Sequence, residues 1–333
     1  PPLARRAAAA QAPGHRGGAS ARLQRRFGRR GARPLCALAG AAVAVSAPLG
    51  PGFSAPLARR HAASLGPERP ALVLAHGFGG GKQFLGSSWP LEYFRGIGDR
   101  LRRIGYDVLV TEVPTFGTVA SRAEVLCDQI DKWPERRGRR VSVMAHSMGG
   151  LDARYAISKL GGNCFVDTLL TVSTPHHGSP VADLLLTRTR VFHDIWRCHM
   201  PGFFKELPDS GRCLSVEGAL EFNSEVPDAV GVRYLSVAGD RGSWQRTSPE
   251  LMPSYLYIAS HKGVAGGPND GMVSVGSATW GRLLTKIDMD HLHQINFPLP
   301  HRWVTNAPSY QDVLEQWCVL ARHAVKGEGE APR

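Results

Sequence analysis

The sequence predicts an α/β fold with a mostly parallel, doubly wound sheet, because hydrophobic strands are followed by tight turns and helical patterns. The clearest unit lies at 141–155, where an apolar run with β-branched residues stops at Ala145 and a helical pattern starts at Leu151. A second hydrophobic strand is expected at 71–75. The chain after residue 69 is long enough for one such domain with a substantial core.

Ser147 stands at the apex of the first unit, in the strand–turn–helix pattern of a nucleophile elbow. So tight a turn requires small residues two positions before and two positions after the serine, and Ala145 and Gly149 satisfy that requirement. The helix that follows would present free N–H groups and the positive end of its dipole to an anion. The pattern therefore predicts a nucleophilic serine rather than a serine buried in an ordinary β–α turn.

The turn after the strand at 71–75 predicts an oxyanion hole, which a serine nucleophile needs. Gly77 lets the backbone turn so that the N–H of Phe78 can point toward a developing oxyanion. The N–H of Met148, the residue after the serine, is the expected second donor.

The motifs predict neither a cofactor nor a metal. The glycines at 79–81 precede Lys82 as in a phosphate-binding loop, but the spacing of that loop's earlier glycine and its following Ser or Thr is not met. His176 and His177 are neighbours in the chain, and adjacent side chains seldom converge on one ion. A structural turn is therefore expected at this pair.

The base that accepts the serine proton is expected on a loop after the last strand, because the triad of this fold class runs Ser, acid, His along the chain. His291, His293 and His301 satisfy that order. His291 directly follows an expected closing strand at 283–289 and is the predicted base. His293 is expected to be a surface or lid-contacting residue, and His301 a loop residue.

Two aspartates compete for the role of the acid. Asp270 lies in an Asn-Asp-Gly turn, and Asp240 ends the strand-like segment at 232–238. Either could reach the base on spacing alone, whereas Asp288 and Asp290 are weaker candidates because they adjoin the base. The turn should expose the carboxylate of Asp270, which gives this residue a slight preference.

The chain resembles the bacterial true lipases, the family of the Pseudomonas and Burkholderia triacylglycerol lipases within the α/β-hydrolase superfamily. The matching motifs follow the family's order and are HG (76–77), LEYFRGI (91–97), AHSMGGLDAR (145–154), TPHHGS (174–179), EFN (221–223), NDGMVS (269–274) and HLHQIN (291–296). The resemblance implies an α/β-hydrolase fold with Ser147, Asp270 and His291 as triad. It also implies Phe78 and Met148 as oxyanion donors, and it raises Asp270 above Asp240.

The departures from this family concern its structural calcium. His293 stands where the family has a calcium-binding Asp, and Phe297 stands where it has a Gln. Because calcium prefers oxygen ligands, no structural calcium is expected at this place. His177 replaces the family's arginine in its T-P-H-R-G-S turn, and Gly276 replaces a cysteine.

Charge divides the chain near residue 69. Residues 1–69 hold 12 arginines and a single acid, Glu68, so almost all of the formal charge of +12 lies there. The apolar run at 35–47 is too short to span a bilayer and fits a signal-peptide core, while the Arg-rich character also fits a transit peptide. We expect a presequence or disordered leader at 1–69 and a catalytic domain at 70–333, in the secretory pathway, outside the cell, or in an organelle (plastid) lumen.

The insert between Thr174 and Val232 is much longer than a plain α–β connection. Its large apolar residues lie beside the elbow and predict a helical cap over an acyl pocket at about 184–220. The pattern is compatible with a lid that opens at a lipid surface and with a fixed cap. A disulfide between Cys198 and Cys213 in this cap is a further hypothesis.

Together these features predict a serine hydrolase of lipid carboxylic esters, with triacylglycerol as substrate and transient contact with a lipid interface. The same triad could cleave phospholipid, galactolipid or inositol-linked acyl esters, or transfer the acyl group to an alcohol. A catalytically inactive binding module is the alternative of a different class, and the complete triad argues against it. No nucleic-acid partner is expected, because the domain carries no basic stripe with interleaved aromatic residues; the oligomeric state stays open.

Overall fold

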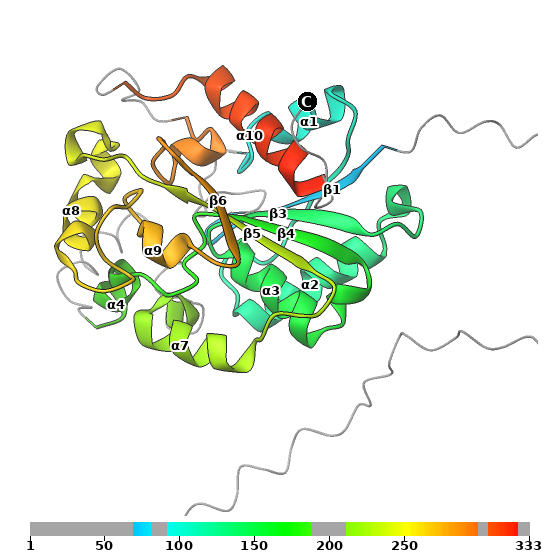
Figure 1. Ribbon diagram of the computed structural model, residues 1–333, viewed down its shortest axis with the longest axis horizontal. Helices are drawn as coiled ribbons and strands as arrows, with labels where there is room; N and C mark the ends of the chain where they lie inside the picture. Colours follow the sequence, from blue (N-terminus) through cyan, green and yellow to red (C-terminus); the bar gives the residue numbers. More distant parts are fainter. Residues whose placement is uncertain (1–68, 81–91, 188–210, 299–305, 326–333) are drawn as a thin grey trace, which may run out of the picture. The chain divides into compact units, whose positions relative to one another are not determined.

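A six-stranded sheet in the order β2-β1-β3-β4-β5-β6 organises the computed structural model (Figure 1), which describes residues 69–80, 92–187, 211–298 and 306–325. All five neighbouring pairs of strands are parallel. The strands are β1 (Ala71–Ala75), β2 (Asp107–Val110), β3 (Val141–His146), β4 (Val166–Val172), β5 (Arg233–Gly239) and β6 (Arg282–Ile287). The predicted α/β fold with a parallel sheet is therefore confirmed.

Helices cover both faces of this sheet, as expected for a doubly wound fold (Figure 1). The helices of the described residues are α1 (Ile97–Arg103), α2 (Val119–Asp131), α3 (Gly149–Lys159), α4 (Pro180–Thr187), α7 (Val216–Glu225), α8 (Met252–Ser260), α9 (Val275–Ala278) and α10 (Tyr310–Val325). Short 3₁₀ helices lie at Pro134–Arg136, Gly162–Cys164, Arg212–Leu214, Trp244–Arg246, Pro249–Leu251 and His293–Ile295. Helices α1 and α10 lie on one face, and α2 and α3 lie on the other (Figure 1).

Strand β1 shows how the sheet divides the core into two layers. Leu72 and Leu74 belong to the hydrophobic cluster that includes α1 and α10 residues, whereas Val73 belongs to the cluster on the side of α2 and α3. Successive side chains of a strand point to opposite faces, so a strand covered on both faces must be apolar at every position. This explains the unbroken hydrophobic run at 71–75.

The insert between β4 and β5 is described only at its ends. Helix α4 ends at Thr187, and the chain is described again from residue 211, shortly before α7 begins at Val216. Residues 188–210 of the expected cap lie outside the described residues, as do His301 and the expected leader up to residue 68. In the described part of the chain, no helix is long and apolar enough to cross a membrane.

Two expectations about these regions need correction. Cys213 is a free cysteine, so the structure does not contain the hypothesised bridge to Cys198, which itself lies outside the described residues. The closing strand was expected at 283–289, but β6 ends at Ile287 because its pairing with β5 ends at Gly239.

Trp317 anchors α10 to the sheet. Its ring is buried and meets Phe94 edge to face, with 5.3 Å between ring centroids. Its indole Nε1–H donates a hydrogen bond of 2.7 Å to the backbone carbonyl of Gln294. The C-terminal helix is therefore tied to the segment that follows His291.

We expect Trp317→Ala to lower the free energy of unfolding by about 3–5 kcal/mol, because it removes a large buried ring and leaves a cavity. Urea unfolding followed by circular dichroism measures this change. Val319→Ala is the matched control, since Val319 lies on the same helix but is exposed and should change stability by less than about 0.5 kcal/mol. Equal effects of the two substitutions would contradict the anchoring role.

Candidate active site

The turn between β3 and α3 holds Ser147 in a backbone conformation that few side chains adopt. Its φ is 56°, in the left-handed region. The Ser147 N–H donates to the carbonyl of Val172 (2.9 Å), and the hydroxyl of Thr174 donates to the carbonyl of Ser147 (2.7 Å). These bonds to the neighbouring strand stabilise the strained turn, so the elbow predicted from the sequence is present in the structure.

Glycine is required at two positions around this turn because the chain segments approach closely. A Cβ atom on Gly149 would lie 2.5 Å from the carbonyl oxygen of Ala75. A Cβ atom on Gly77 would lie 2.6 Å from the Cβ of Ser147 and 2.7 Å from the hydroxyl oxygen of Tyr93. Real carbon atoms do not approach so closely, and any side chain at these positions would push the turn after β1 away from the serine.

The structure brings Ser147, His291 and Asp270 into one hydrogen-bonded series. The distance between Ser147 Oγ and His291 Nε2 is 3.0 Å, and the distance between His291 Nδ1 and Asp270 Oδ2 is 2.8 Å. The alternative acid lies elsewhere, because the carboxylate of Asp240 accepts from Lys286 Nζ at 3.3 Å. Of the two candidate acids, the structure thus places Asp270 beside the histidine.

Asp270 is fully buried, which differs from the exposed carboxylate expected from its turn. Its Oδ1 accepts the backbone N–H groups of Met272 (2.9 Å) and Val273 (2.8 Å). Its Oδ2 accepts from His291 and from the side-chain amide of Gln294, at 3.0 Å from Nε2. Four donors therefore surround this carboxylate in the protein interior, which offsets the cost of burying a charge.

The two expected oxyanion donors belong to the two turns that meet at Ser147, since a Cβ atom on Gly77 would lie 2.6 Å from the Cβ of Ser147. Met148 directly precedes α3, where the first N–H groups of a helix have no helical partner. Phe78 lies in the turn after β1, and its N–H belongs to the same peptide unit as the carbonyl of Gly77. The buried guanidinium of Arg122 donates to that carbonyl (3.2 Å) and to the carbonyl of His76 (2.8 Å). Since the two groups of a trans peptide point in opposite directions, Arg122 helps to fix the direction of the Phe78 N–H.

Sequence reasoning missed a second layer of polar residues behind the triad. The ring of His146 lies 4.5 Å from that of His291, centroid to centroid, and hydrogen-bonds to Tyr93 and Gln294. Two signals were available: His146 directly precedes the serine, and Tyr93 belongs to the LEYFRGI motif. Neither signal reveals that residues so distant in the chain meet behind the triad.

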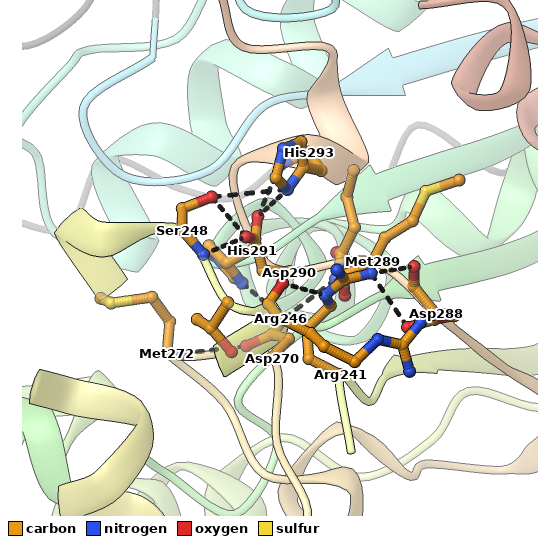
Figure 2. A network of polar contacts seen from close by, with 12 residues as sticks. Arg241, Arg246, Ser248, Asp270, Met272, Asp288, Met289, Asp290, His291 and His293 are labelled. Atoms are coloured by element: carbon orange, nitrogen blue, oxygen red, sulfur yellow. Dashed lines mark hydrogen bonds and ion pairs between the residues drawn. The ribbon is translucent and has the colours of Figure 1, made fainter. Parts of the chain in front are cut away.

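His293 does not lie at the surface, which is one of its two expected places, and most of the cap that it could contact instead lies outside the described residues. The side chain is buried, and its Nδ1 lies 2.7 Å from the carboxylate of Asp290. Figure 2 shows Asp290 between His293 and Ser248, whose backbone N–H donates to the carboxylate at 2.9 Å. Close by, the Arg241 guanidinium donates to the carboxylate of Asp288 at 2.9 Å. This network fastens the chain segment on both sides of His291.

No metal centre emerges from the described residues, where no group of three or more His, Cys, Asp or Glu side chains could hold an ion. The His176–His177 pair belongs to a structural turn instead. His176 is buried and stacks on Trp280, with 5.4 Å between ring centroids. The Asn223 side chain donates to the backbone carbonyl of His176 at 2.7 Å.

The fold and the site together define an α/β-hydrolase with a Ser–His–Asp arrangement at the elbow. Residues 72–264, more than half of the chain, match the alpha/beta hydrolase family, and the chain belongs to this family.

Among relatives, the chain is 32% identical over 215 residues to triacylglycerol lipase 2 of Saccharomyces cerevisiae, covering 62% of this chain and 63% of the yeast protein. The chain thus spans less than two thirds of that relative's length. It is 28% identical over 256 residues to a triacylglycerol lipase of Vibrio cholerae, covering 68% of this chain and 79% of that protein. The crystal structure of the metagenomic carboxyl esterase MGS0156 shares the fold, with a TM-score of 0.62, 22% identity, and coverage of 86% of this chain and 81% of the esterase.

Three of the buried histidines give the folded protein a definite response to acid. Burial, and then the charge of Arg122, lowers the pKa of His76 to about 4. Burial lowers the pKa of His146 and of His176 well below the usual value, with His291 and Arg154 as the next contributions. All three side chains are therefore neutral in the folded protein at a pH where the unfolded chain already binds protons.

We expect the free energy of unfolding to fall as the pH drops from about 6.5 toward 4, because the unfolded chain binds more protons than the folded one. Each histidine contributes up to about 1.4 kcal/mol per pH unit. Asp152 acts in the opposite direction. Burial raises its pKa to about 6, so in acid the folded protein binds a proton on this carboxyl before the unfolded chain does. Urea unfolding at a series of pH values measures the net slope. A free energy that stays constant or rises between pH 6.5 and 5 would contradict the assignment of buried neutral histidines.

Proposed function

We propose that this protein hydrolyses carboxylic ester bonds of lipids, triacylglycerols in particular, through an acyl-enzyme on Ser147. The observation that carries the proposal is the hydrogen-bonded series from Ser147 through His291 to Asp270. The lipid substrate class is supported by the two relatives, both of which are triacylglycerol lipases. The order of motifs that the chain shares with the bacterial true lipases supports a relationship to that family.

The geometry is suited to nucleophilic catalysis in two half-reactions. His291 Nε2 takes the proton of Ser147 as Oγ attacks the ester carbonyl, and Asp270 stabilises the imidazolium that forms. The N–H groups of Phe78 and Met148 bind the oxyanion, each contributing about 3–4 kcal/mol to transition-state stabilisation. His291 then protonates the leaving alcohol, and it activates the water that cleaves the acyl-enzyme.

We also propose that the insert at about 184–220 caps the acyl site. Its first helix, α4, carries apolar residues at 184–186 that are only half-buried. The residue just before α4, Ser179, donates from its hydroxyl to the carbonyl of Met272 at 2.6 Å. Since Met272 lies two residues after Asp270, the insert starts beside the triad, where an apolar helix can contact an acyl chain.

We expect Ser147→Ala to abolish hydrolysis of a soluble short-chain nitrophenyl ester and of an emulsified long-chain triacylglycerol. Asp270→Asn should lower kcat by about 10³–10⁴-fold, because the amide no longer orients and stabilises the imidazolium. Asp240→Asn is the matched control, since Asp240 is the competing carboxylate and lies outside the series. The assignment of the acid is overturned if Asp270→Asn keeps full activity.

The choice of substrate separates the remaining possibilities. Ser147-dependent activity that is stronger on the emulsion supports a lipase. Activity on the soluble ester alone would contradict the triacylglycerol assignment and leave an esterase. If the native protein cleaves neither substrate, the proposal that it is an ester hydrolase is contradicted.

A further inference from the structure

A buried series of hydrogen bonds continues behind the triad, from the acid to the turn after β1. The Gln294 amide Nε2 lies 3.0 Å from Asp270 Oδ2, and its Oε1 lies 3.0 Å from His146 Nε2. His146 Nδ1 lies 2.7 Å from the hydroxyl oxygen of Tyr93. Asp270, His146 and Gln294 have no exposed surface, and Tyr93 is 7% exposed. Four side chains from distant parts of the chain thus form one continuous polar row.

The direction of every bond in this row follows from its chemistry. An ionised carboxylate only accepts, so the Gln294 amide must turn its N–H toward Asp270 and its oxygen toward His146. His146 must therefore carry its proton on Nε2. Because burial, reinforced by His291, lowers the pKa of His146 well below its usual value, the ring is neutral and Nδ1 accepts. The Tyr93 hydroxyl then donates to His146.

The far end of the row reaches the turn that carries the oxyanion donor. The backbone of Gly77 hydrogen-bonds to the Tyr93 hydroxyl and acts to lower the phenol's pKa, although burial has the larger effect and raises it. The fit is tight, since a Cβ on Gly77 would lie 2.7 Å from the hydroxyl oxygen. The N–H of Phe78 follows in the next peptide unit. One row of bonds therefore connects the turn before Phe78 with the carboxylate that faces His291.

We propose that Gln294, His146 and Tyr93 are positioning residues that set the strength and direction of the Asp270–His291 hydrogen bond. The inference rests on the proposed function, because it concerns the same triad. Asp270 Oδ2 accepts from both His291 and Gln294, so the amide fixes this oxygen in space and draws on its negative charge. Hydrogen bonds in a row polarise one another, and the Tyr93 hydroxyl therefore strengthens the amide's effect.

The consequence is a measurable change in the pH profile of kcat/KM, on its acid limb, where activity falls as His291 becomes protonated. Without the Gln294 donor, Asp270 Oδ2 carries more negative charge toward His291 and stabilises its protonated form. The serine then loses its proton acceptor at a higher pH than in the native protein. A purely structural role for the row would lower the stability of the variants without moving this limb.

The test compares three substitutions with a soluble nitrophenyl ester as substrate. We expect Gln294→Met, which keeps the length but removes the amide, to shift the acid limb of kcat/KM upward by about 0.5–1 pH unit. Gln294→Glu should shift it less than Gln294→Met, because a carboxyl group in this buried place beside Asp270 keeps its proton and replaces the amide as hydrogen-bond donor. Tyr93→Phe should shift it in the same direction by less, and each change should lower kcat more than it raises KM.

Tyr255→Phe is the matched control for Tyr93→Phe. Tyr255 is equally exposed, at 7%, but has no part in the row. The acid limb of the Tyr255→Phe protein should therefore coincide with that of the native protein. Near-UV circular dichroism verifies that each variant is folded. A folded Gln294→Met protein with an unchanged acid limb would overturn the proposal, as would an equal shift in Tyr255→Phe.

A second readout does not depend on turnover. The midpoint of the His291 ring titration, followed by NMR, should move upward in Gln294→Met in the same way as the acid limb. If the native protein hydrolyses no ester but this midpoint moves, the proposed function fails and the positioning role stands. If esters are hydrolysed and the midpoint stays in place, the proposed function stands and the positioning role fails.

Discussion

The closeness of two turns is the constraint on which the rest of the site depends. The turn after β1 and the elbow after β3 lie on neighbouring parallel strands, whose carboxyl ends meet at one edge of the sheet. Only glycine at positions 77 and 149 permits the approach that the backbones make there. The contact at Gly149 is with the backbone carbonyl of Ala75, so the sheet itself sets the position of the elbow relative to β1. The peptide before Phe78 is held in addition by the buried side chain of Arg122.

Much of the catalytic arrangement could be predicted from local patterns. The elbow at Ser147 and the strand at 71–75 are encoded within a few consecutive residues, where small residues and apolar runs have an immediate steric meaning. The histidine could be chosen by chain order. The acid could not be decided in this way, because both Asp270 and Asp240 stand at the end of a strand or in a turn, and the choice depends on which turn folds back onto His291.

The surroundings of the triad were beyond local prediction for a physical reason. His293 looks like a surface residue in the sequence, yet Asp290 pairs with it in the interior. The partners of Gln294 are 24 and 148 positions away in the chain. Such contacts follow from tertiary packing, and a polar residue is buried when suitable donors and acceptors surround it. The expectation that the Asp270 carboxylate would be exposed failed in the same way, since four donors enclose it.

The bond between the Trp317 indole and the Gln294 carbonyl has a consequence for how the protein is made. The nucleophile is synthesised early, whereas the segment carrying His291 packs against a helix that follows it in the chain. On the ribosome, a chain that has been made only as far as His291 contains all three triad residues but lacks the support of α10. The segment that carries the base of the triad is thus fully supported only after α10, which follows it in the chain, has also been made.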